Sequence, residues 1–137
     1  INNSAPKSYT LDRAKVSTPK GTSEDVIKFL ANVAEDLREE SILDGGRMSQ
    51  ETDNREICSK IKVPVLILSG AQDTIISTEM HNAVIEAFPD ALQVEFPEAG
   101  HASYAEFPDL FNEEVKEFAK DVWGLNRAHL KPQPDDQ

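Results

Sequence analysis

Two short apolar runs dominate the pattern of hydrophobic and polar positions along the chain. The first, Val65–Leu68, lies between Pro64 and Gly70, and the second, Leu92–Phe96, ends at Pro97. Short runs of branched apolar residues between proline and glycine are typical of strands in a parallel sheet that helices cover. We therefore predict two strands, the first of them buried on both faces.

Apolar residues recur at helical spacing in three longer segments. The first extends over about 22–40, the second over about 77–88 and the last over about 108–122. Serine or threonine at the start of the first two segments can cap a helix, and Pro89 stops the second. These three segments are predicted to be amphipathic helices.

The stretches between these elements are mostly polar. Residues 7–21 contain proline and no sustained period, so we expect a loop there with at most a short helical turn. Residues 47–54 are expected to form a second loop. A short helix over 55–60 would follow and place Ile57 against the core, just before the first strand.

The order strand, helix, strand predicts a βαβ unit with parallel strands. Gly70 allows a sharp turn that leaves Asp73 on a loop after the first strand, and the turn at Pro97 and Gly100 presents His101 after the second. Open α/β sheets build their sites at this carboxyl edge. We therefore expect Asp73 and His101 to lie close together, as an acid that orients a base.

Composition and charge exclude several classes of function. The 137 residues carry a formal net charge of −11 with a pI near 4.6, which argues against binding to nucleic acid or to an anionic membrane surface. No apolar run approaches the ~20 residues that span a bilayer. Cys58 is the single cysteine and has no internal disulfide partner. We expect a soluble, cytoplasmic protein of one domain, without a metal or another cofactor.

The motifs around the two apolar runs follow one another in a defined order. They are Ile61-Lys62-Val63-Pro64-Val65-Leu66-Ile67-Leu68-Ser69-Gly70, Asp73, Phe88-Pro89, Pro97-Glu98-Ala99-Gly100-His101, Glu106-Phe107-Pro108 and Phe111-Asn112. Together they resemble the C-terminal part of an α/β-hydrolase-fold enzyme. The resemblance covers about Ile57 to Val122. It implies that Asp73 is the catalytic acid and that His101 is the general base.

The resemblance also implies a division of the chain, which would have a partial α/β-hydrolase fold of the α/β class. Residues 1–6 would be the end of a core strand and residues 7–55 a small helical cap. Residues 56–124 would form the C-terminal part of the hydrolase core, and residues 125–137 a flexible tail.

One part of the family pattern is missing from this sequence. The family's nucleophile lies on a strand-to-helix elbow such as G-x-S-x-G, and no such elbow occurs here. Ser23, Ser69 and Ser103 lack the small flanking residues that an elbow needs. Two or three strands also leave hydrophobic sheet edges unpaired. We therefore expect the nucleophile and further strands to come from an N-terminal segment, a second chain or a second copy.

Each candidate residue also has a plainer interpretation. An aspartate shortly after a strand is commonly a turn or helix-capping residue, and a histidine after a glycine can belong to an exposed loop. The ordered pattern favours catalytic roles for Asp73 and His101 instead. Glu106 is expected to close a loop or cap the final helix rather than act as an acid.

The remaining polar side chains are expected to be structural or solvated. We expect His81 and His129 in solvent, and Cys58 as a small, partly buried hydrophobic residue. Ser103 and Tyr104 could line a pocket or simply pack. The acidic run over 35–40 is expected on an exposed helix face.

Two classes of function remain open at this point. In the first, the complete protein is a hydrolase whose substrate is small and largely hydrophobic. With a serine nucleophile it would cleave an ester-like acyl bond, and with an aspartate nucleophile an epoxide or a haloalkane. In the second, the chain is a non-catalytic fragment or a binding module that keeps the scaffold. In either class, the chain alone is predicted to be inactive.

Overall fold

A computed structural model describes residues 7–34 and 37–124 of the chain. The predicted strand end over residues 1–6 and the tail over 125–137, which includes His129, lie outside the described residues. The elements are, in order, α1 (Lys7–Val16), α2 (Glu24–Val33), α3 (Glu39–Glu51), α4 (Arg55–Cys58), β1 (Leu66–Gly70), α5 (Thr78–Ala87), β2 (Leu92–Phe96), α6 (Ser103–Glu106) and α7 (Pro108–Trp123).

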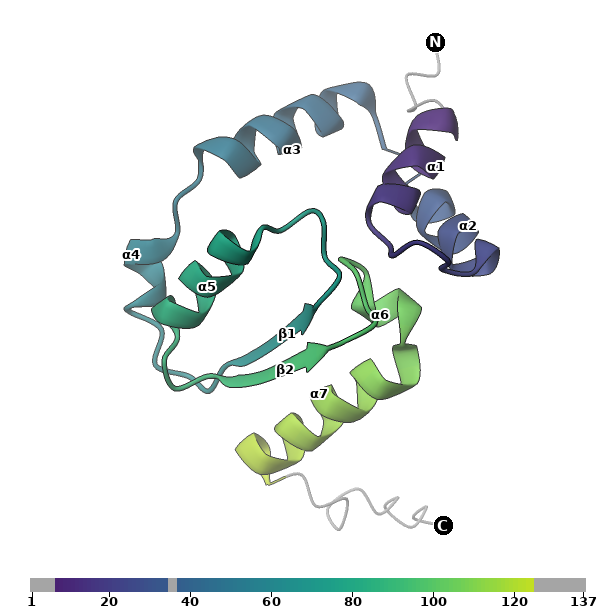
Figure 1. Cartoon of the computed structure of the whole chain (residues 1–137). Helices are drawn as coiled ribbons and strands as arrows, with labels where there is room; N and C mark the ends of the chain where they lie inside the picture. The colour runs from purple at the N-terminus through teal and green to yellow at the C-terminus, as the bar shows by residue number, and fades with distance from the viewer. Residues whose placement is uncertain (1–6, 35–36, 125–137) are drawn as a thin grey trace, which may run out of the picture.

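The two strands form a parallel pair, as the βαβ pattern predicts. Leu66 is aligned with Leu92 at one end of the register and Gly70 with Phe96 at the other. Helix α5 connects the strands, and α5 and α7 lie on opposite sides of them (Figure 1). Helices α1 and α2 lie beyond the carboxyl ends of the strands. The structure thus has the layered α/β arrangement that the sequence indicates.

Local signals explain why the helices beside the strands begin where they do. The Ser77 side chain accepts a hydrogen bond from the Met80 amide at 3.3 Å and caps α5. Pro108 starts α7 at a position where no amide hydrogen is needed. The Phe111 ring of α7 then stacks on Phe96 of β2 with 6.4 Å between centroids. This contact fixes α7 against the end of β2.

The loops after the two strands approach each other very closely. The Ala71 amide donates to the Phe96 carbonyl at 3.0 Å, and the Gln72 amide donates to the Ala99 carbonyl at 2.9 Å, so pairing continues beyond the strands. A β-carbon added at Gly70 would lie only 2.1 Å from the Gly100 carbonyl oxygen. Glycine at position 70 therefore allows the contact that brings the two loops together.

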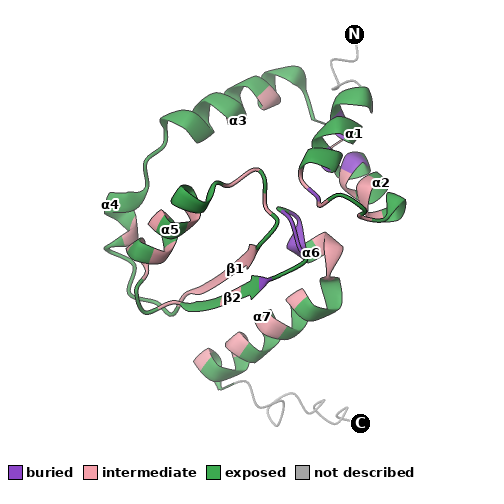
Figure 2. Ribbon diagram, viewed as in Figure 1, coloured by how far each residue is buried: buried purple, intermediate pink, exposed green. Residues whose placement is uncertain are grey.

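The best-buried residues lie near the carboxyl ends of the strands. Figure 2 shows them where α1 and α2 meet and around the loop after β2. Among the described residues, the buried apolar ones are Ala14, Ala31, Phe96, Ala99 and Ala102. Phe96 is the single large side chain in that group. The core of the described residues is thus centred on the loop that carries His101.

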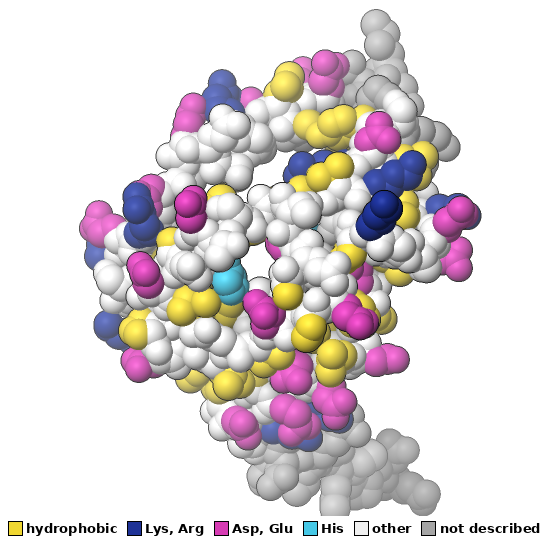
Figure 3. Space-filling view, viewed as in Figure 1, with side chains coloured by type: hydrophobic (Ala, Val, Ile, Leu, Met, Phe, Trp, Pro, Cys, Tyr) yellow, Lys and Arg dark blue, Asp and Glu magenta, His cyan; other side chains and the backbone are white. Residues whose placement is uncertain are grey.

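Strand β1 is less buried than its apolar sequence predicts. All five of its residues are half-buried, and β2 is its one strand neighbour within the described residues. Hydrophobic side chains are also exposed on the surface beside α5 and the strands (Figure 3). The prediction that this strand is buried on both faces is therefore not met by the described residues.

The prediction of a loop over residues 7–21 was wrong, because α1 occupies Lys7–Val16. Its apolar residues are too few to show a helical period. Thr10 and Ala14 are nevertheless buried, and so is Ala31 of α2, against which α1 packs. Small side chains let the two helices approach each other closely, so tertiary packing stabilises a helix that the pattern of polarity does not reveal.

The single helix predicted over 22–40 was also wrong, as was the loop over 47–54. Helix α2 ends at Val33, and α3 extends through Gly45 and Gly46 to Glu51 without burying a residue. Glycine weakens a helix by about 1 kcal/mol but does not forbid it. The short helix α4 was correctly expected. Its Ile57 is 57% exposed, however, and does not pack against the core as predicted.

None of the helices in the described ranges has the length and apolar character needed to cross a bilayer.

Candidate active site

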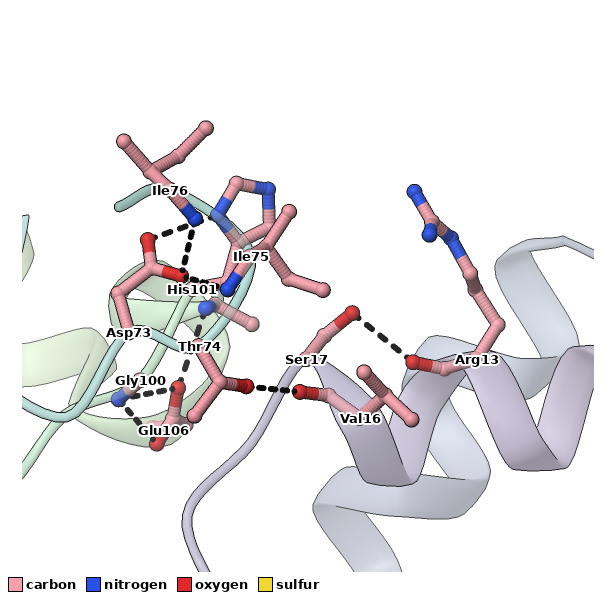
Figure 4. A network of polar contacts seen from close by, with 11 residues as sticks. Arg13, Val16, Ser17, Asp73, Thr74, Ile75, Ile76, Gly100, His101 and Glu106 are labelled. Carbon is pink, nitrogen blue, oxygen red and sulfur yellow. Dashed lines mark hydrogen bonds and ion pairs between the residues drawn. The ribbon is translucent and has the colours of Figure 1, made fainter. Parts of the chain in front are cut away.

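Asp73 lies on the loop after β1, where its carboxylate closes a turn. Its Oδ1 accepts hydrogen bonds from the Ile75 amide at 2.7 Å and the Ile76 amide at 3.0 Å. Figure 4 shows these contacts. The plainer interpretation of Asp73 as a turn residue is therefore correct for one oxygen. The same bonds fix the direction of the other oxygen.

The second carboxylate oxygen of Asp73 contacts the imidazole of His101. The distance between Asp73 Oδ2 and His101 Nδ1 is 2.9 Å (Figure 4). Because an ionised carboxylate can only accept, the contact requires the proton to be on Nδ1. The neutral ring then presents an unprotonated Nε2, which can accept a proton. The side chain of Asp73 is 16% exposed and that of His101 41% exposed, so solvent reaches the base more than the acid.

The surroundings of Asp73 keep it ionised. Partial burial alone would raise the pKa of the Asp73 carboxyl. Hydrogen bonds from His101 and from the amides of Ile76 and Ile75 outweigh burial, so this pKa lies below its ordinary value. An ionised carboxylate beside Nδ1 stabilises the imidazolium that forms when the ring accepts a proton.

Three consecutive backbone amides hold the loop that carries His101. The Gly100 amide donates to both carboxylate oxygens of Glu106, at 3.1 and 3.0 Å, and the Ala102 amide donates to Glu106 Oε1 at 3.1 Å. The His101 amide donates to the Ser17 carbonyl at 2.9 Å. Glu106 thus closes the loop, as the sequence predicts.

The end of α1 and the residue after it contact the loops of both Asp73 and His101. The Thr74 hydroxyl donates to the Val16 carbonyl at 3.0 Å (Figure 4). The neighbouring Ser17 carbonyl accepts from the His101 amide, as described above. A β-carbon at Gly100 would lie 2.8 Å from Pro19 Cδ, so the packing is tight there as well. Sequence patterns missed this junction because backbone carbonyls leave no residue-specific signal.

A cavity of about 330 Å³ opens beside the Asp73–His101 pair. Its walls combine side chains of β1 with residues of α5 and the loops. His81 is half-buried at this wall, so the prediction that it is simply solvated was wrong. Ser103 is buried at 7% exposure and lines the same cavity, whereas Tyr104 is 53% exposed. Cys58 is half-buried, as predicted.

The described part of the chain contains an acid and a base but no nucleophile bonded to the base. Within residues 7–34 and 37–124, no serine hydroxyl or cysteine thiol forms a hydrogen bond with the His101 ring. The same residues contain no group of three or more His, Cys, Asp or Glu that could hold a metal ion. The predicted proximity of Asp73 and His101 is confirmed, and their catalytic roles stay a prediction.

The parallel strands, with an acid and a base on the loops that follow them, define the chain as a part of an α/β-hydrolase fold. A family model described as the alpha/beta hydrolase fold matches residues 4–108. The chain therefore belongs to this family. The match confirms both the resemblance carried by the motifs and the predicted fold class.

Curated proteins that resemble the chain include esterases. The chain is 32% identical over 80 residues to the pimeloyl-[acyl-carrier protein] methyl ester esterase of Pectobacterium atrosepticum, an alignment that covers 58% of this chain and 31% of that protein. The chain thus spans about a third of the length of this curated relative.

Solved structures show the same fold. An esterase from Exiguobacterium antarcticum has a TM-score of 0.75 and 20% sequence identity, covering 83% of this chain and 42% of the esterase. The enol-lactonase from Burkholderia xenovorans has a TM-score of 0.72 and 23% identity, covering 83% of this chain and 45% of the lactonase. In each comparison, the chain spans less than half of the solved protein.

Proposed function

We propose that this chain supplies the catalytic acid, Asp73, and the general base, His101, of a hydrolase that cleaves carboxylic esters or similar acyl bonds. The 2.9 Å contact between Asp73 Oδ2 and His101 Nδ1 is the observation that carries the proposal. The relatives support the reaction class, since two of them are named as esterases and one as an enol-lactonase.

The proposed reaction begins with the base. Nε2 of His101 accepts the proton of a serine hydroxyl as the hydroxyl oxygen attacks the ester carbonyl carbon, and Asp73 stabilises the resulting imidazolium. The imidazolium then returns the proton to the leaving alkoxide, which departs as an alcohol and leaves an acyl-enzyme. A water molecule then gives one proton to Nε2 as its oxygen attacks the acyl carbon. The imidazolium returns that proton to the serine oxygen, which leaves as a free hydroxyl while the carboxylic acid is released.

The serine and the remaining strands would come from a polypeptide outside this sequence. That polypeptide could be an N-terminal segment of the same product, a separate chain or a second copy. Two observations support this part of the proposal: the sequence has no nucleophile elbow, and β1 remains half-buried. Apolar cavity walls that include Ile67, Leu68 and Ile76 favour a small, largely hydrophobic substrate.

A second candidate function is a non-catalytic fragment or a binding module. The absence of a nucleophile elbow favours it. In that case the Asp73–His101 contact would only fix the two loops.

Hydrolysis of p-nitrophenyl butyrate distinguishes the candidates. The test uses the chain alone and the complete protein, meaning this chain assembled with the polypeptide encoded directly upstream of Ile1. We expect no turnover by the chain alone, turnover by the complete protein and a loss of at least about 10³-fold in kcat for His101→Ala. Turnover by the chain alone, or an active His101→Ala protein, would overturn the proposal.

A further inference from the structure

We propose that Glu106 is a positioning residue, which fixes the imidazole of His101 by binding the backbone amides on both sides of it. The inference rests on the proposed function for its catalytic consequence. Its structural basis is independent of that function. It concerns a half-buried carboxylate that does not itself contact the His101 ring.

One carboxylate group accepts three hydrogen bonds from two amides. Both oxygens of Glu106 lie within 3.1 Å of the Gly100 nitrogen, and Oε1 also lies 3.1 Å from the Ala102 nitrogen. Gly100 and Ala102 are buried, so water cannot easily replace a lost acceptor. Hydrogen bonds to an ionised acceptor are also stronger than those between neutral groups. Glu106 is thus the main acceptor for this loop.

The position of Glu106 in the sequence explains how it reaches both amides. It is the last residue of α6, the short helix that begins two residues after His101. Its own amide donates to the Ala102 carbonyl at 3.0 Å, while its side chain turns back to the Ala102 and Gly100 amides. Side chain and main chain therefore close the same turn, with His101 held between two fixed residues.

Fixing the backbone on both sides of His101 also fixes the direction in which its side chain leaves the backbone. The ring must reach Asp73 Oδ2 with Nδ1 and present Nε2 to a nucleophile, and both depend on the direction of the Cα–Cβ bond. Without Glu106, the Ser17 carbonyl would be the remaining acceptor for these three amides. The ring would then sample orientations that do not support proton transfer, and small misplacements of catalytic groups cost about 10²-fold in rate.

Charge and geometry predict a graded response to substitution. Alanine at position 106 removes all three hydrogen bonds. Glutamine keeps Oε1, which accepts from both amides, but places an amide group where Oε2 accepted from Gly100. We therefore expect kcat to be highest with glutamate at position 106, lower with glutamine and lowest with alanine.

The experiment compares Glu106→Ala and Glu106→Gln in the complete protein, with Glu113→Ala as the control. Glu113 is exposed on α7, outside the loop that carries His101. We expect Glu106→Ala to lower kcat by about 10- to 100-fold with KM changed less than about threefold. Glu106→Gln should recover part of that loss, and Glu113→Ala should match the unmodified protein.

A second readout does not depend on activity. NMR of protein labelled with ¹⁵N-histidine reports the Nδ1 proton of His101, which we expect to be protected in the unmodified protein, weakened in Glu106→Gln and lost in Glu106→Ala. If Glu106→Ala does not fold, Glu106→Gln decides the question. An unchanged Nδ1 signal and an unchanged kcat in Glu106→Gln would then overturn the inference.

The two proposals fail in different ways. A complete protein that retains the Glu106-dependent Nδ1 signal but has no esterase activity contradicts the proposed function alone. A complete protein that loses activity in His101→Ala but keeps it in both Glu106 variants contradicts the positioning role alone.

Discussion

The two carboxylate oxygens of Asp73 have separate partners. Oδ1 binds the amides of Ile75 and Ile76, and Oδ2 binds His101. The local structure of the loop and the orientation of the base therefore depend on one residue through different atoms. A substitution that changes one oxygen and keeps the other can separate these two roles.

Asp73→Asn is such a substitution. The amide oxygen can still accept from Ile75 and Ile76, so the fold should be retained. The amide NH₂ would face Nδ1 and favour the tautomer that has its proton on Nε2, which cannot act as a base. We expect kcat of the complete protein to fall on the order of 10²- to 10⁴-fold, with an unchanged circular dichroism spectrum. Asp53→Asn, an exposed aspartate beside Arg55, is the control.

The pKa of Asp73 predicts a dependence of stability on pH. Because hydrogen bonds hold this pKa lower in the folded than in the unfolded chain, the unfolded state binds more protons between the two values, and stability rises with pH there. The contribution is complete above the ordinary aspartate pKa of about 3.9. It is lost as the pH falls through the folded pKa.

Urea unfolding of the complete protein and of Asp73→Asn between pH 6 and pH 2.5 measures this effect. The unfolding free energy of the complete protein exceeds that of Asp73→Asn by an amount that should be constant at the upper end of this pH range. This amount should shrink at the lower end. A difference that does not change with pH would contradict the assignment of the hydrogen bonds to the ionised carboxylate.

Gly70 is the residue at which the two loops come closest. A β-carbon there would lie 2.1 Å from the Gly100 carbonyl oxygen and 2.4 Å from that of Ala99, and backbone atoms cannot move aside cheaply. We expect Gly70→Ala to destabilise the complete protein by about 2 kcal/mol or more and to abolish activity.

Gly46→Ala provides the matched control for this substitution. Gly46 lies in α3, with nothing within 4 Å of an added β-carbon. The same chemical change should therefore stabilise the protein by about 0.5–1 kcal/mol. Thermal unfolding measures both effects, and a stable, active Gly70→Ala protein would show that the loops are not held this closely.

At the scale of elements, the end of α1 bridges the two loops of the site. Val16 and Ser17 lie next to each other, and their carbonyls accept from Thr74 on the acid loop and from His101 on the base loop. The sheet aligns the ends of the strands, and α1 holds the loops that follow them. Two elements from distant parts of the sequence thus set the geometry of one pair of side chains.

Thr74→Val tests the contribution of this bridge. Valine has the same shape as threonine but cannot donate to the Val16 carbonyl. We expect the free energy of unfolding of the complete protein to fall by about 1 kcal/mol, whereas Thr74→Ser, which keeps the hydroxyl, should leave it nearly unchanged. Urea unfolding measures both variants, and equal stability of the valine and serine variants would contradict the bridge.

The sequence predicted the elements whose signals are local. Ser77, Pro89 and Pro108 mark helix ends by their own chemistry, and β1 and β2 are short apolar runs with a helix between them. Parallel pairing then brings Asp73 to His101. The roles of Val16 and Ser17 could not be predicted, because they use backbone carbonyls. Helices α1 and α3 were missed because one has small buried residues and the other has none.

At the scale of the whole molecule, the described residues bury few large side chains. The apolar residues of β1 are half-buried, and Val63, Leu92 and Met80 are at least half exposed. A stable domain needs a contiguous apolar core. The described residues therefore provide a framework for the site without much of the apolar burial that would stabilise it.

This exposure predicts how the isolated 137-residue chain behaves. We expect it to bind the dye ANS and to lose its helical signal gradually on heating, since exposed apolar surface and weak cooperativity accompany loose packing. The complete protein should bind little dye and unfold in one sharp transition. A sharp calorimetric transition for the isolated chain, without dye binding, would contradict the proposal that further strands cover β1.

None of the thirteen residues of helix α3 is buried. Bending it away would disturb little besides its own backbone hydrogen bonds, whereas displacing α1 would break contacts with both loops. Changes in α3 should therefore leave Asp73 and His101 in place, whereas changes at the end of α1 act on the loops of both.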